Sequence, residues 1–310
     1  MSPRPGQGTL PRPGSIDNGP ARTRRWPRNV SSPVPDLIPA AIRVHICVVG
    51  DAHLDVVVRV TGPVAEDTDT PATTHLGVGG QGANVAAWAA ALGAGSRLIA
   101  PRGTDLAARL LTEELASRGV ELTGPVVPGR TGVVVALSDG GRHRSMLTDR
   151  GVGIAIAAGD LAAEWIEGCD WLHVAAYSLA SEPSRGAAIA AMRVAAARSV
   201  RLSIDVSSTA LIQSYGTSRF RKLLGSLDPD VIFGTQAEAA MLGAGLTERL
   251  VVKLGEAGVI VAGRRFPARP AVAVDATGAG DAFAAGYLIG GVDLGLTAAA
   301  RAVARMGGMP

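Results

Sequence analysis

Short apolar runs that alternate with helix-like segments are the main pattern of this sequence. Residues 44–49 form a nearly continuous apolar run, which is typical of a strand covered on both faces. From residue 165 onward, further runs of this kind are followed by segments with helical periodicity. This alternation predicts an α/β fold with a central, mostly parallel sheet flanked by helices. The expected strands lie at 44–49, 98–100, 171–174, 202–206, 231–233 and 250–254, and the expected helices at 82–92, 105–117, 184–198, 282–289 and from 236 onward.

One segment in the first half has a different pattern. Residues 132–137 and 144–147 are strand-like, and the turn at 138–141 between them predicts an antiparallel hairpin. A strand is also expected at 55–60, whereas 72–76 has a poor strand pattern.

The N-terminal segment differs in composition from the rest. Residues 1–41 are rich in Pro, Arg, Gly and Ser without apolar periodicity, so we expect a disordered tail. Residues 1–43 hold seven arginines against Asp17 and Asp36, a net of +5, which leaves about −2 for the remainder of a chain whose net charge is +3. The folded part is therefore not basic, and we expect no nucleic-acid partner. No apolar segment with a cleavage site follows the arginine cluster at 22–26, so export is not expected.

Cysteine usage and hydropathy bound the environment of the protein. The two cysteines, Cys47 and Cys169, lie in apolar stretches and indicate no disulfide framework, which is typical of a reducing cytoplasm. No apolar run reaches the length that spans a bilayer, so no membrane partner is expected. A chain of 310 residues with 47% apolar content can bury a large core.

Candidate chemistry is concentrated at residues 274–286, where polar turn residues lead into an apolar helix. Unpaired N–H groups and the helix dipole predict an anion site at 278–280. Asp281 falls in the first helical turn beside that anion, which suggests a general base in phosphoryl transfer. The structural alternative is that Asp281 complements the helix dipole and Asp275 forms an Asx-turn.

Two motifs resemble the signatures of one enzyme family. Residues 275–281 resemble the second signature of the ribokinase-like, or PfkB, family of carbohydrate kinases, and residues 79–84 resemble the first. The two motifs occur in the family's order, and the resemblance covers residues 44–308.

The glycines of the first motif also allow a dinucleotide-binding interpretation. Gly77, Gly79 and Gly82 match G-x-G-x-x-G, but that fingerprint needs an apolar strand before it and an acid about twenty residues later. Residues 72–76 are a poor strand, and position 97 is an arginine. A nicotinamide-dependent oxidoreductase is therefore the weaker hypothesis.

The resemblance implies a kinase domain over residues 42–310, with a ribokinase-like fold and a small β lid from about 56–76 and 130–150. It implies phosphorylation of a hydroxyl of a sugar or nucleoside with ATP and Mg²⁺, ribose being the first candidate, and it allows a monovalent cation and a homodimer through the lid. Asp281 would be the general base. The implied site residues are Gly278, Ala279 and Gly280 in the anion hole; Asp55, Gly80, Gln81, Gly82, Asn84 and Asp275 at the acceptor; Thr235, Lys253, Gly255, Gly258 and Thr277 at the nucleotide; and Glu238 near Mg²⁺ through water.

The sequence departs from the family pattern in two places. Thr235 stands where the family has an asparagine, and residues 297–306 lack the asparagine expected on the adenine side. Two alternatives therefore stay open: a nucleoside kinase of the same family, and a non-catalytic relative that binds a sugar or nucleotide. For Asn84 the alternative to a sugar contact is an ordinary N-cap.

Four other positions carry weaker expectations. His53 is expected to be a solvated loop residue, and His173, inside an apolar strand, a satisfied core histidine. Tyr177, just past that strand, is a candidate for the sugar pocket. Residues 148–151 end the predicted hairpin, either as a solvated loop or within reach of the acceptor.

The tail interpretation leads to a deletion test. A variant that starts near Ala41 should keep the melting temperature and the kinase activity of the full chain, because the composition of the tail cannot bury enough apolar area to offset its ordering entropy. Thermal melting and ATP turnover of both chains check this. A large loss of either would mean that the tail packs on the domain or completes its site.

Overall fold

The computed structural model describes residues 44–138, 144–243, 246 and 249–310. The chain divides into two units, Met1–Pro39 and Ala40–Pro310, and all described residues belong to the second. The tail expected at 1–41 and most of the turn expected at 138–141 lie outside the described residues.

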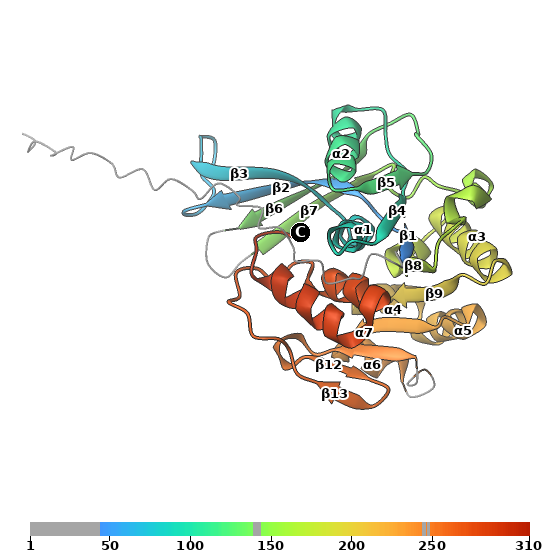
Figure 1. Ribbon diagram of the computed structural model, residues 1–310. Coiled ribbons are helices and arrows are strands. Elements are labelled where there is room, and N and C mark those ends of the chain that lie inside the picture. Colours follow the sequence, from blue (N-terminus) through green and yellow to red (C-terminus); the bar gives the residue numbers. More distant parts are fainter. Residues whose placement is uncertain (1–43, 139–143, 244–245, 247–248) are drawn as a thin grey trace, which may run out of the picture. The chain divides into compact units, whose positions relative to one another are not determined.

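Within this described part, one large sheet carries the fold (Figure 1). Its parallel strands are β1 (His45–Val49), β4 (Gly95–Ile99), β5 (Val120–Thr123), β8 (Trp171–Ala175), β9 (Arg201–Asp205), β10 (Val231–Thr235) and β11 (Leu250–Lys253). Two short strands, β12 (Val259–Val261) and β13 (Arg264–Phe266), extend one edge antiparallel. The strand order is β13-β12-β11-β10-β9-β8-β1-β4-β5, so the expected mostly parallel sheet is confirmed.

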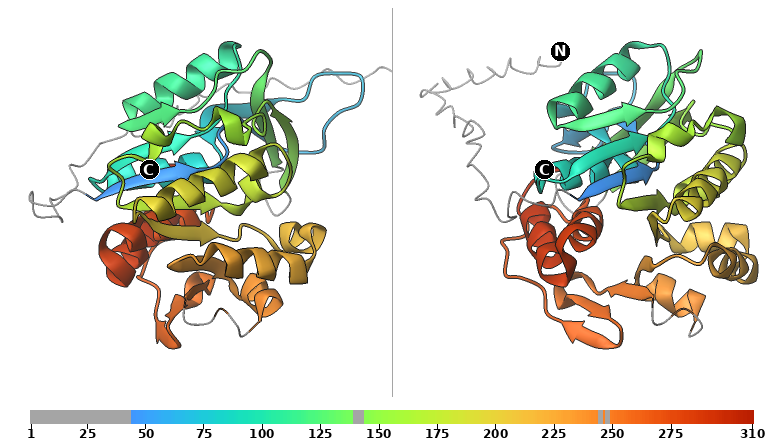
Figure 2. Two further views of the ribbon diagram at one scale, coloured as in Figure 1. Left: turned by 90° about the vertical axis from the view of Figure 1, so that its right-hand side faces the viewer. Right: turned by 45° about the vertical axis from the view of Figure 1, so that its right-hand side comes forward.

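Helices cover both faces of this sheet (Figure 2). In β1, Ile46 and Val48 pack on one side while Cys47 and Val49 pack on the other, because alternate side chains of a strand point to opposite faces. The first side is covered by α1 (Gln81–Ala91), α2 (Leu106–Ser117) and α7 (Ala279–Val303). The second side is covered by α3 (Ser184–Ala197), α4 (Thr209–Tyr215), α5 (Thr217–Leu227) and α6 (Gln236–Leu242).

A separate four-stranded sheet among the described residues forms the expected lid, in the order β3-β2-β6-β7. Its strands are β2 (His53–Val60), β3 (Ala72–Gly79), β6 (Thr131–Ser138) and β7 (Arg144–Gly151). β2 pairs parallel with β6, and the outer strands pair antiparallel. The expectation that residues 72–76 are a poor strand is wrong, because pairing with β2 outweighs their weak propensity. The residues before the glycine motif thus form an antiparallel lid strand, not the parallel strand of a dinucleotide fold.

The helix α7 is long and apolar enough to cross a membrane by length and composition alone, and among the described helices it alone passes that test. Its surroundings are those of a core helix, since Phe283, Ala284 and Leu288 are buried and pack in the same cluster as α1. The backbone is also non-helical at Gly290 and Gly291, where two helical segments meet at a kink.

The start of α1 depends on a close approach between two backbones. A Cβ on Gly82 would lie 2.6 Å from the Cα of Gly50, at the turn that follows β1. Gly80, the N-cap of α1, has φ 107°, and a Cβ there would lie 2.5 Å from the carbonyl oxygen of Asp51. The glycines of the first motif therefore let α1 begin against the end of β1.

This contact predicts opposite effects for two Gly→Ala substitutions. Gly82→Ala should lower the free energy of unfolding by about 1–3 kcal/mol, because the new methyl meets backbone atoms that cannot rotate away. Gly225→Ala, in α5 with open space around the new Cβ, should raise it by about 0.5–1 kcal/mol. Urea unfolding of both variants checks this, and equal stability of the two would contradict it.

Candidate active site

A cavity of about 440 Å³ lies where β1, β9, β10 and β11 reach their carboxyl ends, and residues of the lid sheet also line it. Ligands of parallel α/β sheets bind at this edge. Residues of both motifs meet there, although about 200 positions of the chain separate them. The crossover connections between the parallel strands bring them together. The expected residues that line the cavity are Asp55, Gly80, Gln81, Asn84, Thr235, Glu238, Lys253, Thr277, Gly278 and Asp281.

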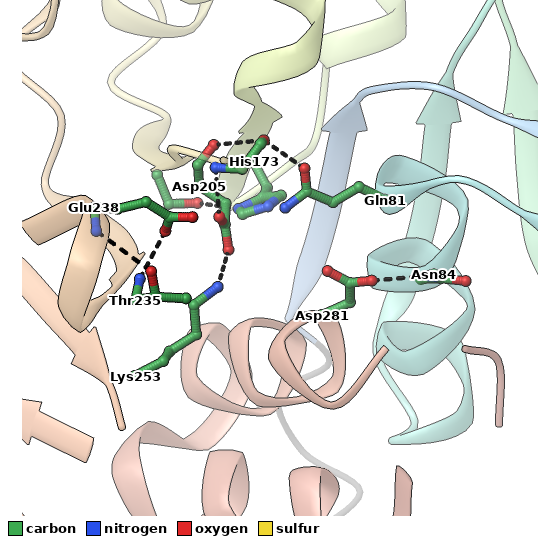
Figure 3. Close-up of polar contacts among 10 residues, drawn as sticks. Gln81, Asn84, His173, Asp205, Thr235, Glu238, Lys253 and Asp281 are labelled. Carbon is green, nitrogen blue, oxygen red and sulfur yellow. Dashed lines mark hydrogen bonds and ion pairs between the residues drawn. The ribbon is translucent and has the colours of Figure 1, made fainter. Parts of the chain in front are cut away.

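Asp281 is the acid at the centre of this arrangement. It lies in the first turn of α7, and its Oδ2 accepts a hydrogen bond of 2.8 Å from Nδ2 of Asn84 on α1 (Figure 3). Burial raises the pKa of Asp281 to about 7, although the bond from Asn84 and the charge of Lys253 act in the opposite direction. Asn84 is not the N-cap of α1, which is Gly80 and makes no side-chain cap bond. Its amide is therefore available for the cavity and for Asp281.

A buried ion pair lies beside Asp281. Nζ of Lys253, at the end of β11, is 2.6 Å from Oδ2 of Asp205, at the end of β9 (Figure 3). Burial alone would lower the pKa of Lys253, but the Asp205 carboxylate outweighs it and the pKa is raised. Lys253 thus stays charged, and its Nζ would lie 3.2 Å from a Cβ placed on Gly280. The cation therefore lies against the start of α7.

Thr235 and Glu238 form a capping box at the start of α6. Oγ1 of Thr235 accepts from the Glu238 N–H at 3.4 Å, and Oε2 of Glu238 accepts from the Thr235 N–H at 2.7 Å. Glu238 is 5% exposed and lines the cavity. One carboxylate oxygen is therefore committed to the helix cap, which fits contact with a metal through water better than a full place in its coordination shell.

The loop before α7 is held by Asp275. Its Oδ1 accepts from the N–H and the hydroxyl of Thr277 at 2.9 and 2.6 Å, and its Oδ2 accepts from the Gly307 N–H at 3.0 Å. Asp275 does not line the cavity. The resemblance predicted that Asp275 lies at the acceptor. In the structure, Asp275 instead forms the Asx-turn of the structural alternative.

The three residues of the expected anion hole differ in position. Gly278 lines the cavity, and its φ of 74° together with the packing of Gly308 against its Cα requires glycine there. Ala279 and Gly280 do not line the cavity, and the Ala279 N–H lies 3.3 Å from the carbonyl oxygen of Ala276. The backbone N–H groups that lie nearest the cavity at the start of α7 are thus those around Gly278.

Three other expected glycines also lie outside the cavity lining. Gly82 is buried against Gly50, as described above. Gly258 is buried in the turn after β11, where its N–H bonds to Gly255 and a Cβ would meet the carbonyl oxygen of Phe266. Gly255 is exposed with open space around it. These three glycines shape the loops beside the cavity, but none of the three lines the cavity itself.

The part of the cavity lined by the turn after β1 and the start of β2 is acidic. Asp51, His53 and Asp55 all line it, with His53 between the two carboxylates: Nε2 lies 3.0 Å from Oδ1 of Asp55 and Nδ1 lies 3.8 Å from Oδ2 of Asp51. The expectation of a solvated loop histidine is wrong, because β2 begins at His53 and directs the ring into this pair. A Cβ on Gly79 would meet the Asp55 carboxylate at 2.2 Å, so this glycine lets Asp55 lie against β3.

The lid contributes one cation and one aromatic contact. Residues 148–151, expected as the end of a hairpin, belong to β7, and Asp149 and Arg150 line the cavity. The guanidinium carbon of Arg150 is 5.5 Å from the ring centroid of Tyr177, which also lines the cavity. Tyr177 therefore lies at the pocket, as the sequence suggested.

In the lining of the cavity, Gln81 is held from the loop after β9. Its Oε1 accepts a 2.5 Å bond from the Ser207 hydroxyl, and Ser207 has a left-handed φ of 67°. Strained backbone of this kind is concentrated at functional sites. His173 is fully buried as expected, with Nδ1 2.9 Å from the Ser203 hydroxyl, and burial lowers its pKa to about 4. Its Nε2 has no hydrogen-bond partner among the described residues, so it is only partly satisfied.

Sequence reasoning missed Asp205 as a site residue, gave Asp51 no role although it follows a buried strand, and left Asp149 open as part of residues 148–151. Asp205 ends an apolar strand run, as Asp51 follows one, and an acid at the carboxyl end of a buried parallel strand is a recognisable signal. Asp149 had no such signal, because its place follows from the pairing of β7 with β6.

Comparison with known proteins agrees with this geometry. Residues 44–308 match the pfkB family carbohydrate kinases. A fructokinase of Salmonella typhimurium is 31% identical over 233 residues, which cover 68% of this chain and 75% of that protein. An ATP-dependent ribose-1-phosphate kinase of Halopiger xanaduensis is 31% identical over 261 residues, which cover 79% and 84%. The crystal structure of adenosine kinase from Sinorhizobium meliloti aligns with a TM-score of 0.72 at 22% identity, covering 87% of this chain and 96% of that one.

The chain therefore belongs to the pfkB family of carbohydrate kinases, and it is a sugar kinase of that family. The expected family and the ribokinase-like α/β fold are confirmed. Kinases of this family use ATP with Mg²⁺.

The raised pKa of Asp281 makes stability depend on pH in a defined direction. In the unfolded chain this acid titrates near 3.8, and in the folded chain it titrates near 7. Its contribution to the free energy of unfolding is therefore full below about pH 4 and is lost as the pH rises through 7. Asp281→Asn removes the titration. The stability of the variant relative to the parent should therefore rise between pH 4 and 7, by about 1–3 kcal/mol because the carboxylate keeps partial contact with solvent.

Thermal or urea unfolding of both proteins at several pH values checks this, with Asp293→Asn, an exposed acid on α7, as the matched control. A stability difference that stays flat from pH 4 to 7 would show that Asp281 titrates like an ordinary carboxyl.

Proposed function

We propose that this kinase transfers the γ-phosphoryl group of ATP to a hydroxyl of a neutral sugar, with ribose as the first candidate and Asp281 as the general base. The observation that carries the proposal is the Asp281 carboxylate, which lines the cavity at the start of α7 and is held there by Asn84. A carboxylate at a helix start next to a phosphate site is unfavourable for binding alone, and it is useful when it removes a proton.

The pKa of Asp281 supports this role. A general base works best when its pKa lies near the working pH, because it is then both deprotonated and basic enough to take the proton. With a pKa of about 7, Asp281 satisfies both conditions near neutrality. Asn84 donates to one carboxylate oxygen, which orients the other oxygen toward the acceptor hydroxyl.

Positive groups around the start of α7 would stabilise the transferring phosphoryl group. The N–H groups near Gly278 and the Lys253 ammonium lie at this helix start, where the positive end of the dipole adds to the field. Asp205 fixes the ammonium, so the cation needs little reorganisation during transfer. Thr277 and Thr235 line the same side and are suited to contact the nucleotide phosphates.

Mg²⁺, when bound with the triphosphate, supplies further neutralisation of charge, and Glu238 would hold it through water. The capping box fixes the Glu238 side chain in advance.

The charge on the acceptor side favours a neutral sugar. Asp51, Asp55 and Asp149 face the cavity there, whereas Arg150 is the one arginine in the lining. Carboxylates accept hydrogen bonds from sugar hydroxyls and repel a phosphate or carboxylate substituent. Ribose and fructose therefore precede sugar phosphates and ketodeoxy sugar acids as candidates, and a nucleoside, which is also neutral, stays the alternative acceptor.

Measured ATP consumption against a panel of acceptors tests the proposal. Ribose and fructose should give the highest kcat/KM, and ribose 1-phosphate and a ketodeoxy sugar acid should fall at least about tenfold below them, as one unfavourable charge contact of about 1.4 kcal/mol predicts. Preference for an anionic acceptor would contradict the assigned substrate class. Absence of ATP consumption with every acceptor would favour the non-catalytic alternative.

The base is tested by Asp281→Asn. The amide keeps the volume of the side chain but cannot accept a proton at neutral pH, so kcat should fall by about 10²–10⁴. ATP affinity should hold or rise, because a negative charge near the γ-phosphate is removed. A folded variant that turns over within a few-fold of the parent would rule out Asp281 as the base, and Asp293→Asn again provides the control.

A further inference from the structure

A second cavity, of about 270 Å³, lies at the other end of the parallel strands from the cavity that contains Asp281, which we call the active cavity. It borders the amino ends of β1 and β4, where His45 and Gly95 lie, whereas the active cavity borders the carboxyl ends of the parallel strands. Arg97, Glu121, Glu167 and Cys169 contribute to its lining. None of these residues takes part in the proposed phosphoryl transfer.

The two cysteines of the chain come together at this second cavity. In the pairing of β1 with β4, Cys47 lies directly opposite Arg97, so the two side chains point to the same face of the sheet. Both side chains donate a hydrogen bond to the carbonyl oxygen of Trp165. Its distance is 3.3 Å from Sγ of Cys47 and 2.9 Å from Nη1 of Arg97.

Cys169 belongs to the same turn. Its N–H lies 3.4 Å from the carbonyl oxygen of Ile166, and the N–H of the next residue, Asp170, bonds to the carbonyl oxygen of His45 at 2.8 Å, which holds the turn beside β1 and makes the Cys169 thiol a neighbour of the Cys47 thiol. The Cys47 thiol has one proton, so it donates either to Trp165 or to the Cys169 sulfur. Cys47 is fully buried, whereas Cys169 is half-buried and lines the cavity. The pair therefore has one thiol with solvent access and one thiol behind it.

The charges around the pair favour the thiolate at Cys169. The hydrogen bond from Cys47 and the charge of Arg97 lower the pKa of Cys169, while its burial and the carboxylates of Asp170 and Glu121 oppose this. The pKa of Cys47 is raised, because its thiol bonds to Cys169 and is buried. Thiolate character and access select the cysteine that reacts first with oxidants, and both favour Cys169.

We propose that Cys169 and Cys47 form a redox-modification site, in which a hydroperoxide oxidises Cys169 and Cys47 then closes an intramolecular disulfide. The Cys169 thiolate attacks the peroxide oxygen, so that the O–O bond breaks, Cys169 becomes a sulfenic acid and the other oxygen leaves as hydroxide, which takes up a proton to give water. The Cys47 sulfur then attacks the Cys169 sulfur, and the hydroxyl leaves with the Cys47 proton as a second water. Two thiols are oxidised and one hydrogen peroxide is reduced to two waters.

The full-length protein tests this directly, because Cys47 and Cys169 are the only cysteines in the sequence. The reduced protein is treated with hydrogen peroxide, unfolded, and alkylated to count the remaining thiols by intact mass. Both thiols should disappear together with a loss of two hydrogen masses and no gain of oxygen. Reductant should restore both, and peptide mapping should link residue 47 to residue 169 within one chain.

Two variants separate the steps. In Cys47→Ser, whose hydroxyl can still donate to Trp165, dimedone should trap a sulfenic acid on Cys169 after peroxide treatment. In Cys169→Ser, the same treatment should leave Cys47 unlabelled by dimedone and still alkylatable after unfolding. Cys47→Ala serves in place of Cys47→Ser if the serine variant does not fold.

Four outcomes would overturn the proposal. Both thiols of the parent could survive a peroxide dose that oxidises Cys169 in Cys47→Ser, the parent could gain oxygen without a disulfide, or Cys47 could be labelled in Cys169→Ser. A disulfide between two chains, seen on a non-reducing gel, would also overturn it. Each readout is independent of kinase turnover.

Discussion

The contact between Asn84 and Asp281 is the interaction on which the active cavity depends. It joins the first turns of α1 and α7, two helices that cover the same face of the main sheet, and each brings one family motif. Burial of the carboxylate would be costly without this bond, since an ionised group removed from water needs a partner. The bond leaves a pKa of about 7, between that of a free carboxyl and that of an unpaired buried acid. Burial thus raises the basicity of the acid, and this hydrogen bond moderates the rise while it holds the carboxylate in position.

The geometry around this bond depends on backbone contacts more than on side chains. α1 can start beside the end of β1 because Gly80 and Gly82 have no Cβ, and α7 can start where it does because Gly278 packs against Gly308. Asp275 ties the loop to the segment at Gly307. The acids and glycines of the two motifs therefore divide into two groups: some line the cavity, and others hold the backbone that carries them.

Much of this architecture could be predicted from the sequence, because each buried parallel strand is an apolar run and each of the two motifs marks the start of a helix. The short strands β12 and β13 and the helix α4 could not, since each has too few residues for a periodic pattern to show. Asp275 shows the limit of a motif: its place in the signature suggested the acceptor, while its local turn chemistry, which the sequence also contained, describes its actual contacts. His53 and Asp149 depended on strand pairing in the lid, which is a tertiary property.

Several unfavourable features lie around the active cavity. Asp281 has a raised pKa, Ser207 has a left-handed backbone, Asp205 and Lys253 are buried charges, and the Nε2 of His173 behind them has no hydrogen-bond partner within the described part of the chain. Each of these costs stability, so the large apolar clusters on both faces of the sheet must offset them. A neutral core at the same place would be more stable, but it would hold neither a base near neutrality nor a fixed cation beside a phosphoryl group. The placement of these costs at the carboxyl ends of the parallel strands therefore supports the site proposed there.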